Sequence, residues 1–302
     1  MRLVPVQELP QTQDAAASLD HCRLLEEGNI LFFKQIPFPL SQEDHNFFLS
    51  QQQTGAQFHK NIAYRPHLDR ITGFKKGAKT DRLRLLEVMR RFSRSAVDYL
   101  ARLLPAYAQD WQVDYASFRP QEEEGRQARL RARNDLLHVD SFPTRPTQGD
   151  RILRFFTNIN PDTPRRWQTA DPFPQLIEHL QSTRSIPSHL LAPRGRVTQA
   201  VRRLKAQLRK LGFSLRVGST YDDFMLRLHH YLKENQNLLS DFPTYSWDFP
   251  AGSSWLVFTD IVPHAALSGR FALEQTLIVS QGSQTLPEAA PLAILGRIGM
   301  PN

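Results

Sequence analysis

The sequence predicts a mainly β protein with helices, whose core is an antiparallel jelly roll or barrel. Segments rich in branched and aromatic residues lie on both sides of a long helical stretch, which is typical of strands separated by an insertion. No strand–helix–strand alternation links these segments, so a doubly wound parallel sheet is not favoured. We find no internal repeat and no linker, and we therefore expect the 302 residues to form a single domain.

In chain order, the first predicted element is a long amphipathic helix over residues 83–104. Leu100 and Leu104 are among the apolar residues that recur there at helical intervals, with arginine and aspartate between them. We expect N-terminal helices to pack on the core. Short segments bounded by turn-forming residues follow at 115–119 and 136–140, where we expect the strands to begin.

The segment 151–160, RILRFFTNIN, has the composition of a strand and ends at an Asn-Pro-Asp turn. The chain then turns helical, and we predict a helical insertion over about 165–243. Strand composition returns at 252–260 and 271–280. The predicted core strands therefore lie on either side of the insertion.

The chain is basic, with 38 Lys+Arg against 30 Asp+Glu and a formal net charge of +8. Its 40% of apolar residues can bury a sizeable core, which excludes an intrinsically disordered protein. The charge predicts an anionic partner, namely nucleic acid, an acidic membrane surface or a small acidic substrate. No recognised nucleic-acid-binding motif is present, so we do not expect nucleic acid to be the partner.

Cys22 is the single cysteine, which excludes an intrachain disulfide and a cysteine-based zinc site and predicts a reducing compartment. The N-terminal MRLVPVQELPQTQ contains no apolar stretch, and no segment approaches the roughly 18 apolar residues of a membrane-spanning helix. We expect a cytoplasmic protein. Peripheral contact with the cytoplasmic face of the inner membrane is an alternative that the charge leaves open.

The segment LLHVDSF contains the residues that point to chemistry. His138 and Asp140 project from the same face of a strand, so an imidazole and a carboxylate there can bind one metal ion. His264, just past the predicted strand GSSWLVFTD, would complete the two-histidine, one-carboxylate set of non-haem Fe(II) oxygenases. The alternative is a simple hydrogen bond from His138 to Asp140 at the end of a strand.

The order of HVD, RILRFFTNINP and PAGSSWLVFTDIVPHAALSGRFALEQT, together with KNIAYRP at 60–66, resembles a known family. It is similar to the 3-deoxy-D-manno-oct-2-ulosonic acid (Kdo) hydroxylases of the Fe(II)/2-oxoglutarate dioxygenase superfamily. The likeness runs over most of the chain. It implies a double-stranded β-helix core and an Fe(II) ion held by His138, Asp140 and His264.

The resemblance also implies a reaction. The expected co-substrates are 2-oxoglutarate and dioxygen, and the expected products include succinate and carbon dioxide. The expected substrate is the Kdo sugar of a lipid A precursor in lipopolysaccharide biosynthesis, hydroxylated at C3 to give the acid called Ko.

The distal carboxylate of 2-oxoglutarate needs a cation, and an Arg fork matches a carboxylate. Many superfamily members place that cation nine to eleven residues beyond the distal histidine, but residues 273–275 are not basic here. We favour Arg154, which strand alternation places on one face with Asn158, and we expect both residues to contact the co-substrate. Arg270 is the second candidate. A salt bridge from Arg154 to Asp150 or Glu274 at the sheet edge, and a solvent-facing Arg270, are the alternatives.

Two further segments offer contacts for an acidic sugar. Lys60, Tyr64 and Arg65 supply two charges and a hydroxyl for a carboxylate or phosphate, unless their segment is an ordinary solvated loop. Arg145 lies five residues beyond Asp140, on a turn expected to border the pocket mouth. It either meets the acid group of the sugar or is a plain loop arginine.

Two predicted helices of the insertion carry basic groups. His229 and His230 lie in YDDFMLRLHHYLKEN, which we interpret as a surface helix because no second metal-binding pair supports a site there. The helix VRRLKAQLRKL, within 201–211, has an apolar stripe flanked by arginine and lysine. It either lies on anionic lipid or packs its stripe on the core and exposes the basic flanks.

Two rival functions remain open from the sequence. The chain could be a 2-oxoglutarate dioxygenase with another anionic target, such as a protein side chain or alkylated nucleic acid. It could also be a non-catalytic basic protein that binds nucleic acid, for which the net charge is the only support.

Overall fold

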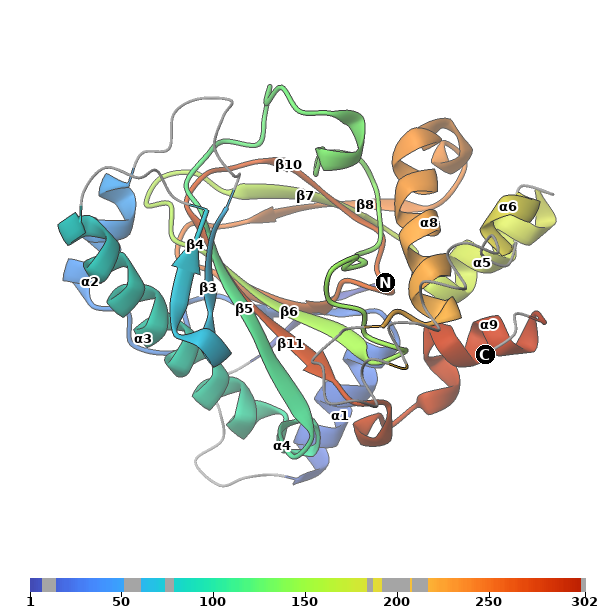
Figure 1. Cartoon of the computed structure of the whole chain (residues 1–302), viewed down its shortest axis with the longest axis horizontal. Helices are drawn as coiled ribbons and strands as arrows, with labels where there is room; N and C mark the ends of the chain where they lie inside the picture. The colour runs from blue at the N-terminus through green and yellow to red at the C-terminus, as the bar shows by residue number, and fades with distance from the viewer. Residues whose placement is uncertain are drawn as a thin grey trace.

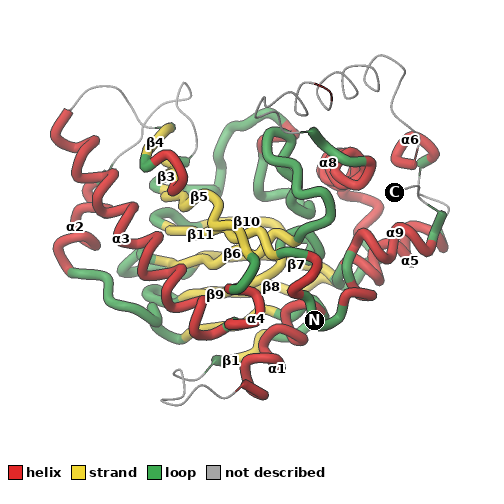
Figure 2. Tube along the Cα trace, turned by 60° about the horizontal axis from the view of Figure 1, so that its bottom comes forward, coloured by secondary structure: helices red, strands yellow, loops and turns green. Residues whose placement is uncertain are grey.

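The structure is a computed structural model that describes residues 1–6, 15–51, 61–73, 79–183, 187–191, 207 and 217–299. Two sheets face each other, with helices on both flanks of the stack of strands (Figures 1 and 2). The buried side chains of the sheets and helices form one hydrophobic cluster. The prediction of a mainly β core with helices is confirmed.

The larger sheet has eight strands in the order β1-β2-β9-β6-β11-β5-β3-β4. Its pairs are antiparallel except for β1 and β2, which run parallel. β6 and β11 occupy its centre, so their residues are the most enclosed in the sheet. The strands are β1 (Leu3–Pro5), β2 (Ile30–Phe33), β3 (Ile62–Arg65), β4 (Arg70–Thr72), β5 (Trp111–Arg119), β6 (Arg151–Asn158), β9 (Ser254–Phe258) and β11 (Ala272–Val279).

The smaller sheet is antiparallel in the order β10-β7-β8. Its strands are β7 (Arg165–Ala170), β8 (Thr244–Phe249) and β10 (His264–Ser268). The strand expected at 136–140 does not form. An isolated antiparallel bridge pairs His138 with His264 instead, so the HVD segment runs beside β10. Residues far apart in the sequence therefore meet at one end of this sheet.

Stacked aromatic rings fill the space between the two sheets close to β10. The rings of Phe249 and Trp255 lie 3.9 Å apart and nearly parallel, and the Trp167 ring meets Trp255 edge-on at 5.3 Å. Trp167 also stacks on His264, with 5.2 Å between the ring centroids. This packing holds the imidazole of His264 against a rigid apolar wall.

The N-terminal helices cover the outer face of the larger sheet, as predicted (Figure 1). They are α1 (Ala15–Glu26), α2 (Gln42–Ser50), α3 (Lys79–Leu103) and α4 (Pro105–Ala108). The long helix predicted over 83–104 is α3, but its buried stripe runs through Leu85, Met89 and Phe92, whereas Leu83 is 63% exposed. The stripe lies where α3 contacts β5 and β11.

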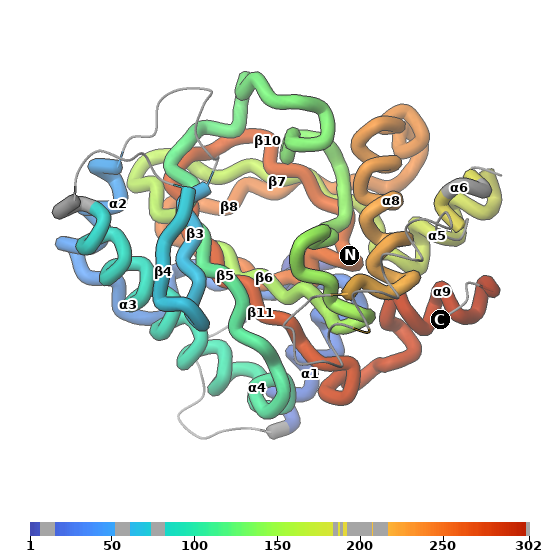
Figure 3. Tube along the Cα trace, in the orientation of Figure 1, coloured from blue at the N-terminus to red at the C-terminus, as the bar shows by residue number. Residues whose placement is uncertain are grey.

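The helical insertion starts later than predicted. Residues 165–170 form strand β7, and helices follow only from α5 (Phe173–Ser182), through α6 (Ser188–Leu191) to α8 (Thr220–Glu234). A short helix α9 (Pro291–Arg297) near the C-terminus packs against α5. The basic helix predicted at 201–211 falls outside the described residues, apart from position 207. In Figure 3, α8 lies beside the chain that precedes β6.

No helix among the described residues is both long and apolar enough to span a bilayer.

Candidate active site

A pocket of about 400 Å³ opens between the two sheets. Its wall is unusually charged for a protein interior. It contains three histidines, two carboxylates and several basic side chains, namely His138, His229, His264, Asp140, Glu274, Arg119, Arg131, Arg145, Arg154, Arg165 and Lys233. Buried charges persist only when they pair or bind ligands, so this pocket is the candidate active site.

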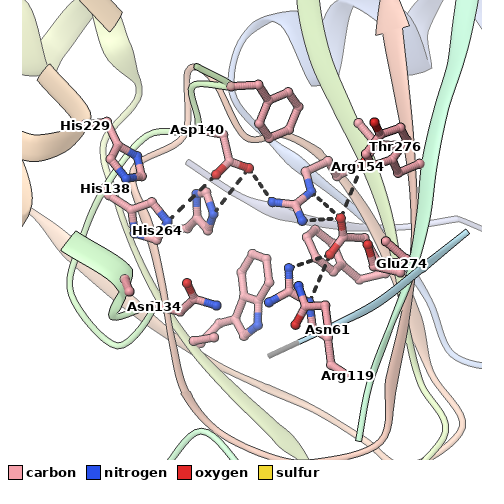
Figure 4. A pocket seen from close by; sticks show the side chains of 18 of the residues that line it. Asn61, Arg119, Asn134, His138, Asp140, Arg154, His229, His264, Glu274 and Thr276 are labelled. Atoms are coloured by element: carbon pink, nitrogen blue, oxygen red, sulfur yellow. Dashed lines mark hydrogen bonds and ion pairs between the residues drawn. The ribbon is translucent and has the colours of Figure 1, made fainter. Parts of the chain in front are cut away.

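The structure brings together the three predicted metal ligands, all of them buried. The Nε2 atoms of His138 and His264 lie 3.8 and 4.0 Å from the two carboxylate oxygens of Asp140 (Figure 4). The backbone fixes these positions, because the amide of Asp140 donates to the Thr259 carbonyl at 2.8 Å. An ion placed between them would meet two nitrogens and one oxygen from a single side of the pocket.

Each imidazole is oriented by a backbone carbonyl. Nδ1 of His138 bonds to the Leu136 carbonyl at 2.7 Å, and Nδ1 of His264 bonds to the Val262 carbonyl at 2.9 Å. A carbonyl only accepts, so Nδ1 carries the proton in both rings and the lone pair of Nε2 faces the pocket. This is the arrangement that metal-binding histidines need from their hydrogen-bonding partners.

Burial and neighbouring charges favour the protonation state in which each of these three groups can bind a metal ion. Burial opposes ionisation of Asp140, yet the Arg154 guanidinium beside it holds the pKa of the carboxyl well below its usual range. Burial lowers the pKa of His138 and of His264. At neutral pH the site therefore presents a carboxylate and two neutral imidazoles, which are the protonation states that bind a metal ion.

His229 is a third histidine of the pocket, which the sequence interpretation missed. Its ring lies 4.9 Å from that of His138, and possible ligand atoms of His138, Asp140 and His229 all lie within 4.8 Å of one another. Its Nδ1 bonds to the Val139 carbonyl at 2.7 Å. The interpretation of this segment as a surface helix was wrong, because α8 packs Leu228 and its other apolar residues inward and carries His229 to the pocket.

Arg154 lines the pocket beside Phe156, as strand alternation predicted. It forms ion pairs with both Asp140 and Glu274, and Glu274 in turn accepts from the Nη2 of Arg119 at 2.6 Å. One carboxylate therefore pairs with two buried guanidiniums. Burial raises the pKa of Glu274, but the two arginines outweigh it and lower the pKa to about 2. The salt bridge considered from the sequence is present, but at the centre of the sheet rather than at its edge.

Arg165 is a second residue that sequence reasoning missed, because its strand was placed in the helical insertion. It is 1% exposed and lines the pocket, and its Nη1 donates to the Gly269 carbonyl at 2.6 Å. Its nearest carboxylate, Glu123, is 3.5 Å away, and its Nε has no partner among the described residues. Burial lowers the pKa of Arg165 to about 10, which marks it as an under-compensated cation.

Comparison with known proteins decides the family. The family described as 3-deoxy-D-manno-oct-2-ulosonic acid (Kdo) hydroxylase matches residues 8–301. The chain belongs to the Kdo hydroxylase family. It is similar to crystal structures of the Kdo hydroxylase KdoO, a non-heme Fe(II) α-ketoglutarate-dependent dioxygenase. A search of the curated proteins finds no match.

Two of these structures illustrate the likeness. The KdoO complex with α-ketoglutarate and Fe(III) has 32% identity and a TM-score of 0.81, covering 99% of this chain and 96% of KdoO. The cobalt(II) complex has 33% identity and the same TM-score, covering 99% and 95%. This likeness confirms the predicted jelly-roll fold. It also confirms that the family uses iron and 2-oxoglutarate, as predicted.

Two residues predicted to bind the co-substrate of this Kdo hydroxylase family member lie elsewhere. Arg270 is exposed and stacks on the ring of Phe271 at 3.9 Å, outside the pocket. Asn158 is buried, but its amide donates to the carbonyls of Thr163 and Phe249 at 3.0 and 3.1 Å. It ties two loops together at the end of β6 and does not line the pocket.

The predicted sugar-binding residues are scattered. Tyr64 faces away from the pocket, where its hydroxyl donates to Asp69 at 3.0 Å, because β3 turns Ala63 rather than Tyr64 inward. Arg65 stacks over Tyr115 at 5.0 Å and does not line the pocket. Lys60 falls outside the described residues.

Arg145 is at the pocket, as predicted from its distance to Asp140. Its guanidinium lies between the rings of Tyr115 and Phe142, at 4.0 and 4.1 Å from their centroids, and pairs with Asp114. A contact with the sugar acid stays a prediction.

Acidification should destabilise the metal-free chain partly through His229. Burial lowers the pKa of His229 from 6.5 to about 4, so the unfolded chain takes up a proton at a higher pH than the folded one. This stability is fully present above pH 6.5 and is lost as the pH falls through about 4, by about 3 kcal/mol. Urea unfolding of the wild type and of H229Q between pH 7 and 4 measures it. Equal losses in both chains would contradict the assignment.

Proposed function

We propose that this chain is an Fe(II)- and 2-oxoglutarate-dependent dioxygenase that hydroxylates the Kdo sugar at C3. The observation that carries the proposal is the buried set of His138, Asp140 and His264, with both Nε2 atoms facing one carboxylate at the pocket wall. Membership of the Kdo hydroxylase family names the sugar.

The residues present fit an iron ion. His138, Asp140 and His264 would hold it, since two imidazoles and one carboxylate on one side leave the other positions open. A bound ferrous ion would supply the activation of dioxygen and the oxidative decarboxylation of 2-oxoglutarate to succinate and carbon dioxide. The protein's own task is to keep the ligand lone pairs aimed inward, which the backbone carbonyls of Leu136 and Val262 do.

The basic wall of the pocket fits the distal carboxylate of 2-oxoglutarate. Arg154 and Arg119 already share Glu274, so their charges are largely compensated. Arg165 has no carboxylate closer than 3.5 Å and has an Nε without a partner among the described residues. We propose that Arg165 makes the principal contact to the distal carboxylate, with Arg154 beside it.

Replacing Arg165 by Ala should therefore weaken 2-oxoglutarate binding. We expect the KM for 2-oxoglutarate to rise about 100-fold, because a buried charge-assisted pair is lost. R166A is the matched control: Arg166 is the next residue on β7 but is 61% exposed, so its KM should stay within about twofold. An unchanged KM in R165A would leave Arg154 as the residue that binds this carboxylate.

We propose a Kdo-bearing lipid A precursor as the acceptor. The +8 charge of the chain favours a substrate that carries phosphates and sugar carboxylates, and also favours peripheral contact with an anionic membrane. Such an acceptor would be met on the cytoplasmic face of the inner membrane.

The function is tested by incubating the purified chain with Kdo-bearing lipid A, Fe(II), 2-oxoglutarate and oxygen. We expect the acceptor to gain one oxygen atom and succinate to form in equal amount. Turnover of another anionic acceptor, with none on Kdo-lipid A, would keep the chemistry and overturn the substrate.

A further inference from the structure

Lys233 is a buried cation of the pocket for which the proposed reaction has so far no task. It lies on α8 one turn after His229, is 3% exposed and lines the same pocket. Its ammonium donates to the carbonyl of Arg131 at 3.1 Å, and among the described residues it forms no ion pair. An ammonium has three donors, so two remain for a ligand.

The surroundings of Lys233 favour an anion. Burial lowers the pKa of its ammonium to about 8, which reflects a charge held without a carboxylate in contact. Keeping such a group in the interior is costly unless a ligand compensates it. The other cations near the mouth are already compensated, since Arg145 pairs with Asp114 and Arg131 pairs with Glu234 at 2.7 Å.

Lys233 and Arg165 occupy different parts of the pocket. Lys233 lies on α8 and donates to the Arg131 carbonyl, whereas Arg165 lies on β7, donates to the Gly269 carbonyl and is 3.5 Å from Glu123. In Figure 4 the labelled histidines lie on one side of Asp140, and Arg154 with Glu274 lies on the other. Among the described residues the pocket therefore has two separate under-compensated cations, and the reaction brings two separate anions, 2-oxoglutarate and the sugar acid.

We propose that Lys233 binds the C1 carboxylate of the Kdo sugar and so places C3 at the metal site, an inference that rests on the proposed function. In this sugar acid C1 and C3 are both bonded to C2, so fixing the carboxylate fixes the position of C3 to within two bonds. The two free ammonium donors can each meet one carboxylate oxygen. Lys233 is a positioning residue for the reacting carbon, and its contact with the sugar carboxylate makes the enzyme specific for acidic acceptors.

Replacing Lys233 by Met keeps most of the length of the side chain and removes its charge. We expect the KM for the Kdo-bearing acceptor to rise about 30-fold or more, while the KM for 2-oxoglutarate stays within about twofold. We also expect succinate to form in excess over hydroxylated product, because C3 is no longer held in place. K233R should recover part of the loss. R227M is the matched control, since Arg227 also lies on α8 and donates to a carbonyl, that of Leu190 at 3.2 Å, but does not line the pocket.

A second measurement changes the substrate instead of the protein. With the wild type, the KM for the C1 methyl ester of the acceptor should exceed the KM for the free acid by about the same factor. K233M should no longer distinguish the ester from the acid. If K233M distinguishes them as well as the wild type does, or if only its KM for 2-oxoglutarate rises, the inference is wrong and the proposed function stands. If the wild type does not hydroxylate the free-acid acceptor at all, the proposed function itself has failed.

Discussion

H264A is expected to abolish hydroxylation, lowering kcat/KM by at least about 1,000-fold, because it removes a nitrogen from a three-ligand site. The same variant should lose the visible charge-transfer band that anaerobic addition of Fe(II) and 2-oxoglutarate produces in the wild type. The band reports the loaded site directly, so it separates a lost metal ion from a misplaced sugar.

The control for H264A is H230A. His230 lies on α8 next to a pocket histidine but does not line the pocket. It should keep both the band and the activity within about twofold of the wild type. An H264A chain that keeps the band would show that His229 or another group completes the site, and would contradict the assigned ligands.

E274Q is expected to cause the largest loss of stability among single pocket variants, about 3–5 kcal/mol in the free energy of unfolding. Glu274 is 2% exposed and accepts from the Nε of Arg154 at 2.8 Å and of Arg119 at 3.0 Å. Without its charge two guanidiniums stay buried beside each other with no shared carboxylate. Urea unfolding at pH 7 measures the loss.

A surface pair provides the comparison for E274Q. Glu43 is 80% exposed and pairs with Arg84 at 2.8 Å, so E43Q should change stability by less than about 0.5 kcal/mol. The pKa of Glu274 is lowered from 4.5 to about 2, so its contribution is present above pH 4.5 and is lost as the pH falls through about 2. E274Q should lack that part of the acid dependence, and an equal acid loss in both chains would contradict the buried pairing.

The proposed metal ligands could be picked out from the sequence because their signals are local. Strand alternation predicted that His138 and Asp140 project together, and both line the pocket although their segment forms only an isolated bridge; the same rule placed Arg154 toward the pocket. His264 follows a strand whose composition is plain, and its bridge to His138 brings the three together.

The rest depends on long-range packing that a single sequence does not display. β7 begins with two arginines, and a strand that buries Arg165 contradicts the usual preference of arginine for the surface. His229 reaches the pocket only because α8 docks against the residues around Arg131, which lie far away in the sequence. Tyr64 and Ala63 alternate along β3, and the face that turns inward depends on the pairing of β3 with β5.

The central claim is hydroxylation of the Kdo sugar at C3, and isotope labelling of that carbon tests it most directly. An acceptor with both C3 hydrogens replaced by deuterium is incubated with the chain, Fe(II), 2-oxoglutarate and ¹⁸O-labelled dioxygen. The mass of the product is then measured by mass spectrometry. We predict the loss of one deuterium and the gain of one labelled oxygen. A product that retains both deuterium atoms, or an acceptor that is unchanged while succinate accumulates, would contradict the claim.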